Sequence, residues 1–140
     1  EKTAIYMRLL GRMPDGTVDP TLETYLDIEN FIDYMILNTY VGNVDWGTQN
    51  FFAARRRGLE STGYKGIPWD TEFVMGIGHS SLITNRVFHS SGVAEPHGHL
   101  RHSDEYRSLF ADRIQRHFFH GGVFTPEVAQ AGVQQIATSS

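Results

Sequence analysis

The residues best suited to chemistry lie in two short segments, residues 43–50 and residues 69–72. The first contains Asp45 and, five positions later, Asn50, while the second contains Asp70. Carboxylate and amide oxygens are the hard ligands that Mg²⁺ prefers, and Mg²⁺ usually adds water and phosphate oxygens to them. A carboxylate can also orient or deprotonate a hydroxyl group. If the fold brings these three residues together, their types indicate metal-assisted phosphoryl transfer.

The spacing of the three residues points the same way. In phosphoryl-transfer enzymes of the protein-kinase type, one Asp orients the acceptor hydroxyl, and an Asn and a later Asp hold the metal ions. Two short strands separate the Asn from the later Asp. Residues 51–57 and 64–69 are expected to form such strands, joined by a turn over residues 58–63. The alternative is that Asp45 caps a turn and Asp70 ends a strand, as Asp often does.

The element that must deliver the first segment is a helix. Its apolar residues recur at the spacing of one helical face: Ile28, Phe31, Ile32, Met35 and Ile36. Asp27 is a suitable N-cap, and Gly42 can end the helix in the left-handed conformation. The candidate loop begins directly after that glycine.

The remaining segments complete an α+β pattern, mainly α with a small β-hairpin. A short helix is expected over residues 4–10, a helix from the N-cap Ser103 to Gly121-Gly122, and a last helix opened by Thr125-Pro126. Residues 73–102 are rich in Gly, Ser and His and show no convincing period. They are therefore expected to form a long loop.

Composition excludes several classes of protein. The 140 residues are 40% hydrophobic, which suits one folded domain with a core. A net charge of −4 gives no electrostatic case for binding nucleic acid or an anionic membrane. No apolar run approaches the roughly 18–20 residues needed to cross a bilayer. The absence of cysteine excludes disulfides and thiolate-metal sites.

Three stretches of the sequence resemble the CotH family of spore-coat and cell-surface proteins, whose members are atypical, secreted-type protein kinases. These stretches are residues 25–34, residues 38–46 and the pair Trp69-Asp70. The resemblance spans about residues 20–137 and is most specific between Asp27 and Glu72. Residues 110–113 and 118–122 are also similar to the helix that follows in bacterial members.

The resemblance implies a fold and a set of roles. Residues 1–140 would be a single partial domain, the central part of a CotH-like kinase's large, C-terminal lobe, with the N-terminal lobe outside the chain. Asp45 would be the catalytic-loop Asp, and Asn50 and Asp70 would bind metal. The cofactors would be ATP and Mg²⁺ or Mn²⁺, and the acceptor a Ser or Thr hydroxyl of a coat or surface protein. The location would be secreted, on the spore coat or on the cell surface.

Two departures from the family pattern motivate an alternative function. Gly47 stands where a Pro commonly follows the Asp-Trp pair, and Gln49 stands where an Asn is common. The alternative is a non-catalytic spore-coat or cell-surface assembly module that retains the fold. In either case the isolated piece is expected to be inactive, because the residues that grip the phosphates would lie in the N-terminal lobe.

Residues beside the candidate site have competing interpretations. Trp46 is expected to anchor the loop by packing. Asn43 could orient the loop by hydrogen bonds or merely tolerate a left-handed conformation after Gly42. Glu72 could bind a second ion, but an exposed position is favoured, and Lys65 is expected on the surface of the returning strand.

Two further clusters of residues have both a functional and a structural interpretation. Arg55-Arg56-Arg57 could bind phosphate or an acidic substrate, although a solvated face is the favoured interpretation. His97, His99 and His102 have a spacing that allows zinc binding, although only Glu95 or Asp104 could add a carboxylate. His117 falls on a helical apolar stripe and is expected to be a hydrogen-bonded core residue.

Overall fold

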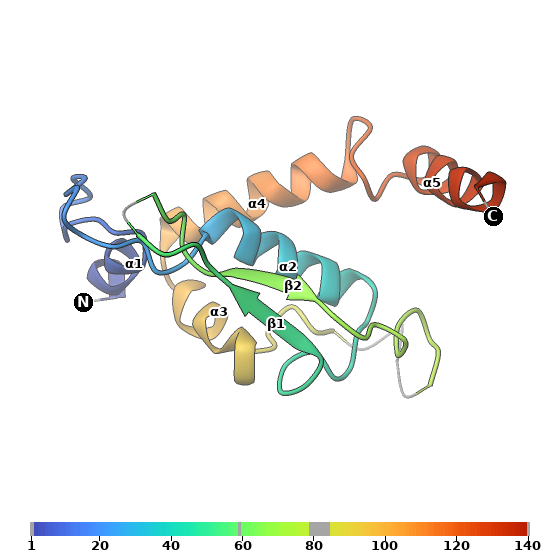
Figure 1. Cartoon of the computed structure of the whole chain (residues 1–140), viewed down its shortest axis with the longest axis horizontal. Helices are drawn as coiled ribbons and strands as arrows, with labels where there is room; N and C mark the ends of the chain where they lie inside the picture. The colour runs from blue at the N-terminus through green and yellow to red at the C-terminus, as the bar shows by residue number, and fades with distance from the viewer. Residues whose placement is uncertain (1, 59, 79–84, 140) are drawn as a thin grey trace.

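The computed structural model describes residues 2–58, 60–78 and 85–139. The elements are helices, a 3₁₀ turn (η1) and two strands: α1 (Lys2–Leu9), α2 (Ile28–Tyr40), β1 (Phe51–Ala54), β2 (Lys65–Pro68), η1 (Gly92–Ala94), α3 (Glu95–Leu100), α4 (Asp104–Phe118) and α5 (Pro126–Thr138). Helix α2 lies at the centre, between α4 and the hairpin (Figure 1). The predicted class, mainly α with a small β-hairpin, is confirmed for these residues.

Helix α2 forms the core as its apolar period predicts. The side chain of Asp27 accepts a hydrogen bond from the backbone N–H of Asn30 at 3.1 Å, as an N-cap does. Four of the five predicted face residues are buried, and Ile28 packs against the core from a partly buried position. Gly42 has a φ of 66° and ends the helix. The candidate loop therefore leaves α2 at the predicted point.

The hairpin is shorter than predicted on both strands. The antiparallel pairing covers only residues 51–54 and 65–68. Arg55 turns away to an ion pair with Glu23 at 2.9 Å. The backbone N–H of Tyr64 donates to Tyr25 O at 2.8 Å, and Tyr64 O accepts from Asp27 N at 3.0 Å. These bonds attach the start of β2 to the chain entering α2 instead of to β1.

The prediction of one long loop over residues 73–102 is wrong in its last part, and residues 79–84 of this range lie outside the described residues. Residues 92–94 form η1 and residues 95–100 form α3. Helix α3 is only six residues long and contains Gly98, so it is too short to show an apolar period. His97 is buried within it.

Helix α4 begins at the predicted cap Ser103 and is joined to α2 by a polar cluster. Asp33 of α2 accepts hydrogen bonds from Arg113 Nε at 2.8 Å and from His117 Nε2 at 2.7 Å. A second bond joins Arg113 Nη2 to the other carboxylate oxygen. His117 is thus a hydrogen-bonded, largely buried residue, as expected.

Helix α5 starts with Pro126 after Thr125, as predicted, but it projects away from the other elements (Figure 1). It has no buried residue. Among the described residues, no helix is long and apolar enough to span a membrane.

Candidate functional site

A chain of hydrogen bonds fixes the loop that carries Asp45 to helix α2. Asn38 Nδ2 donates to Tyr34 O at 2.9 Å, and Asn43 Nδ2 donates to Asn38 Oδ1 at 2.9 Å. Asn43 Oδ1 accepts from the backbone N–H of Asp45 at 3.4 Å. Both Asn side chains are buried, so water does not compete for these bonds. Of the two interpretations of Asn43, hydrogen bonding is therefore the correct one, because its φ is not positive.

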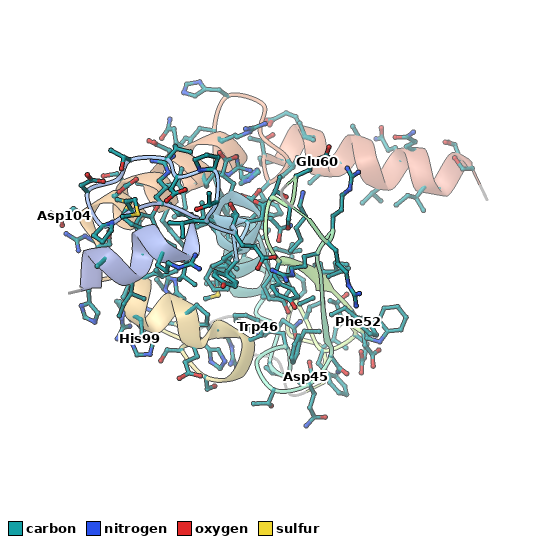
Figure 2. The ribbon with its side chains drawn as sticks, turned by 60° about the vertical axis from the view of Figure 1, so that its left-hand side comes forward. Asp45, Trp46, Phe52, Glu60, His99 and Asp104 are labelled. Carbon is teal, nitrogen blue, oxygen red and sulfur yellow. The ribbon has the colours of Figure 1, made fainter. Side chains whose placement is uncertain are left out.

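Trp46 anchors the same loop by packing, as expected. Its side chain is 1% exposed, and its ring lies 5.5 Å from the Tyr34 ring in an edge-to-face arrangement. The ring of His89 lies 5.1 Å from it. Figure 2 shows Trp46 turned into the molecule beside Asp45. A buried ring of this kind holds the loop and is not available to stack on a ligand.

Asp45 and Asn50 are in direct contact. Asn50 Nδ2 donates a hydrogen bond of 2.7 Å to Asp45 Oδ2. The other carboxylate oxygen, Asp45 Oδ1, is buried and has no hydrogen-bond partner. Buried polar atoms nearly always have a partner, so this oxygen is available to accept a hydrogen bond or to bind a cation.

Asp70 and Glu72 complete an acidic region with Asp45. A side-chain hydrogen bond with Asp70 raises the pKa of Glu72, and the negative charges of Asp70 and Asp45 add to the rise. The two segments predicted from the sequence therefore converge closely enough for their charges to interact. Glu72 is exposed, as favoured, but it takes part in this cluster. The sequence signal was only its closeness to Asp70, two residues earlier.

The backbone is unusual at both predicted metal ligands. Asn50 has a φ of 52° and Asp70 a φ of 50°. Within the described residues, only two other non-glycine residues, Met75 and His120, have a positive φ. Asn and Asp tolerate this conformation better than other residues, but it still stores strain that tends to occur at functional sites.

The donor set fits a divalent cation bound together with phosphate. Asp45 and Asp70 offer carboxylate oxygens, and Asn50, whose nitrogen binds Asp45, offers its carbonyl oxygen. No three His, Cys, Asp or Glu side chains in residues 2–58, 60–78 and 85–139 form a metal site alone. Mg²⁺ does not require such a group, because it keeps waters and takes ligands from the substrate's phosphates.

The three histidines of the zinc hypothesis do not come together. His97 Nδ1 is hydrogen-bonded to Tyr106 Oη at 2.8 Å, and its Nε2 to Val87 O at 3.0 Å. Both ring nitrogens are thus occupied by the fold. The side chain of His99 is 77% exposed and lies 3.9 Å from Glu95. Figure 2 shows His99 on α3, well apart from Asp45.

Three basic residues of the hairpin are paired with acids. Lys65 Nζ lies 3.2 Å from the N-cap carboxylate of Asp27, on a half-exposed side chain. Arg56 pairs with Glu60 on the surface, and Arg55 pairs with Glu23 beneath the Tyr64 ring. The favoured interpretation of Lys65, a surface lysine, agrees with its contact. The favoured solvated face holds for Arg56, but not for Arg55, whose side chain is only 22% exposed.

An exposed aromatic pair beside the acids was missed by sequence reasoning. Gly66 faces the Tyr34 ring of α2, so the alternate residues Phe52, Ile67 and Trp69 face outward. They are 53%, 46% and 57% exposed, and the rings of Phe52 and Trp69 are 5.1 Å apart. The signal was available: Phe52 follows Asn50 by two residues, and Trp69 precedes Asp70.

Comparison with known proteins adds one positive result. The sequence matches the family described as CotH kinase protein over residues 4–139. No curated protein and no solved structure matches. Because the family match covers nearly all of the 140 residues, the chain belongs to the CotH kinase protein family.

Proposed function

We propose that this chain is the central part of the large lobe of an atypical protein kinase. Its reaction is ATP- and Mg²⁺-dependent transfer of a phosphoryl group to a protein Ser or Thr hydroxyl. The observation that supports this most is the contact of Asp45 with Asn50, which leaves a buried carboxylate oxygen without a partner beside Asp70 and Glu72. Family membership gives a kinase-like activity in general terms.

Each of the three residues has a distinct role in this proposal. Asp45 orients the acceptor hydroxyl and takes its proton, while Asn50 holds one carboxylate oxygen in place. Asn50 Oδ1 and the Asp70 carboxylate bind the metal. The bound metal supplies charge neutralisation for the phosphates, which is the main requirement of phosphoryl transfer.

The outward face of the hairpin supports nucleotide binding next to these acids. Phe52 and Trp69 lie on the strand ends that carry Asn50 and Asp70, and both rings are exposed. An aromatic face can stack on a nucleobase. The N-terminal lobe would cover this face from the other side.

The same proposal extends to the acceptor and the location, which the resemblance to the family suggests. The acceptor is a protein of a coat or cell surface, and the protein acts outside the cytoplasm. Mn²⁺ can replace Mg²⁺ at a site of one amide and carboxylate oxygens.

The proposal is tested by phosphate transfer from labelled ATP, using the complete protein that carries this chain. Asp45→Ala and Asp70→Ala are each expected to abolish transfer without unfolding the protein. Asp112→Ala is the matched control, because Asp112 is an exposed Asp on α4. Undiminished transfer by both site variants would overturn the proposal.

The alternative, a non-catalytic assembly module of the coat or cell surface, is motivated by Gly47 and Gln49. The unfolding temperature measured with and without ATP distinguishes the enzyme from the assembly module. A Mg²⁺-dependent stabilisation by ATP supports the enzyme, since a ligand that binds only the folded state raises its stability. No stabilisation at saturating ATP and Mg²⁺ supports the module.

A further inference from the structure

One segment outside the proposed chemistry touches the candidate catalytic loop at several points. This segment, residues 89–93, comes well after Asp70 in the chain and lies directly before α3. Because its contacts are with Trp46 and Gly47, the two residues that follow Asp45, its position bears directly on the placement of Asp45.

The first contact is between rings. The His89 ring lies 5.1 Å from the Trp46 ring, tilted by 42°, on a Trp that also meets Tyr34. Ser91 Oγ lies 3.2 Å from His89 Nε2 and fixes the orientation of the imidazole. Burial lowers the pKa of His89, and the charge of Arg86 lowers it further, so the ring is neutral at neutral pH.

The second contact is between backbones. The N–H of Val93 donates a hydrogen bond of 2.7 Å to Gly47 O. Gly92 has a φ of 59°, and a Cβ there would lie 1.7 Å from the same oxygen. Only glycine allows this close approach.

The third contact is between residue 47 and the His89 ring. A Cβ on Gly47 would lie 2.4 Å from His89 Nε2, which is closer than two such atoms can approach. A side chain at position 47 therefore requires the imidazole to shift from its present position. Gly47 and His89 are matched to each other.

We propose that His89 is a positioning residue, which holds Trp46 and Gly47 so that Asp45 keeps its orientation toward the acceptor. Residues 89–93 then act as a clamp on the candidate catalytic loop, and Gly47 replaces a bulkier residue because His89 occupies the space. This inference rests on the proposed kinase function for its effect on rate, but not for the clamp itself.

The clamp is tested without activity by ¹⁹F NMR of the complete protein labelled with 5-fluorotryptophan. The Trp46 resonance is identified by its loss in Trp46→Phe. His89→Ala and Gly47→Ala are each expected to shift this resonance toward the solvent-exposed value and to leave that of Trp69 unchanged. An unchanged Trp46 resonance in His89→Ala overturns the clamp.

The positioning role is tested by a double-mutant cycle on phosphate transfer. His89→Ala is expected to lower kcat by up to about 100-fold, because small misplacements of reacting groups have effects of this size, with KM for ATP unchanged. Gly47→Ala should cause a similar loss by displacing the ring, and the double variant should lose no more than either single variant. His89→Phe, which keeps a ring on Trp46, should recover part of the rate.

The outcomes separate this inference from the proposed function. If the parent transfers phosphate and His89→Ala transfers equally fast, or if the two losses are additive, the positioning role is overturned. If the parent transfers none, the proposed function fails, and the ¹⁹F measurement alone decides whether the clamp exists. His99→Ala is the control, because His99 is an exposed histidine on α3.

Discussion

Two aspartates in this molecule show how different two polar clusters can be. Asp33, between α2 and α4, uses both carboxylate oxygens, one on Arg113 and the other on Arg113 and His117. Asp45, in the loop after α2, uses one oxygen on Asn50 and leaves the other buried without a partner. The fold supplies partners for both oxygens of the first carboxylate, whereas one oxygen of the second has no partner in the protein.

The same contrast separates the two regions that the sequence offers as metal sites. His97 is a metal-binding type of residue, but Tyr106 and Val87 already occupy its ring nitrogens. At the acids of the loop and hairpin, a hydrogen bond with Asp70 raises the pKa of Glu72, and the negative charges of Asp70 and Asp45 raise it further. Residue types alone could not distinguish these regions, because the difference lies in whether the fold supplies the partners.

The largest expected effect is on the stability of the protein when each of the two aspartates is replaced. Asp33→Ala leaves Arg113 and His117 without their acceptor, so it should lower the unfolding free energy by about 2–3 kcal/mol, the usual worth of hydrogen bonds to charged groups. Asp45→Ala removes one hydrogen bond but also relieves the repulsion between Asp45 and Glu72, so it should change stability by less than about 1 kcal/mol. Urea unfolding of both variants measures the difference. A larger loss in Asp45→Ala would break the comparison.

A smaller effect on stability is expected at the hydrogen bond between His97 and Tyr106. Tyr106→Phe removes the hydroxyl that binds His97 Nδ1 and leaves a buried ring nitrogen without a partner, which should cost about 1–2 kcal/mol. Phosphate transfer by the complete protein should not change, because the pair lies away from Asp45. Unfolding by urea gives the first quantity, and labelled ATP gives the second. Loss of transfer with stability intact would assign this cluster a role in function.

The pH dependence of the protein's stability should also depend on the Asp33 cluster. Burial raises the pKa of Asp33, but hydrogen bonds and charges from Arg113 and His117 outweigh burial and leave the pKa below its ordinary value. A lowered pKa in the folded state stabilises the protein above the ordinary value, about 3.9, and this stabilisation is lost as pH falls through the folded pKa. Stability should therefore fall below about pH 4, and less steeply in Asp33→Asn. Equal slopes in urea unfolding at acidic pH would contradict this.

The smallest effect is expected on the affinity for zinc. Because His97 is hydrogen-bonded through both nitrogens, His99→Ala should bind zinc as weakly as the parent does. Isothermal titration with Zn²⁺ at neutral pH compares them. A clear loss of affinity in His99→Ala would restore the zinc hypothesis for this part of the chain.

The sequence was most predictive where short-range signals decide the structure. The apolar period of α2, its cap Asp27 and its stop Gly42 are local, and all three occur as predicted. The Asp-to-Asn spacing also produced a real contact, because both residues belong to one loop. The roles of Asp45, Asn50 and Asp70 in catalysis stay predictions.

The sequence was least predictive where distant segments meet. Asn38 lies inside a helix, and nothing around it shows that it binds Asn43 and thereby supports Asp45. The contact of His89 with Trp46 joins residues 43 positions apart, across a segment without a period. Tertiary contacts of this kind also shortened the hairpin, since Tyr64 pairs with residues 25–27 instead of extending β2.

The isolation of α5 has a consequence for exchange with solvent deuterium. A helix of 13 residues is marginal in water without tertiary support, and α5 has no buried residue. Amide protons of α5 should therefore exchange far faster than those of α2. Slow exchange in α5 would reveal another surface packed against this helix.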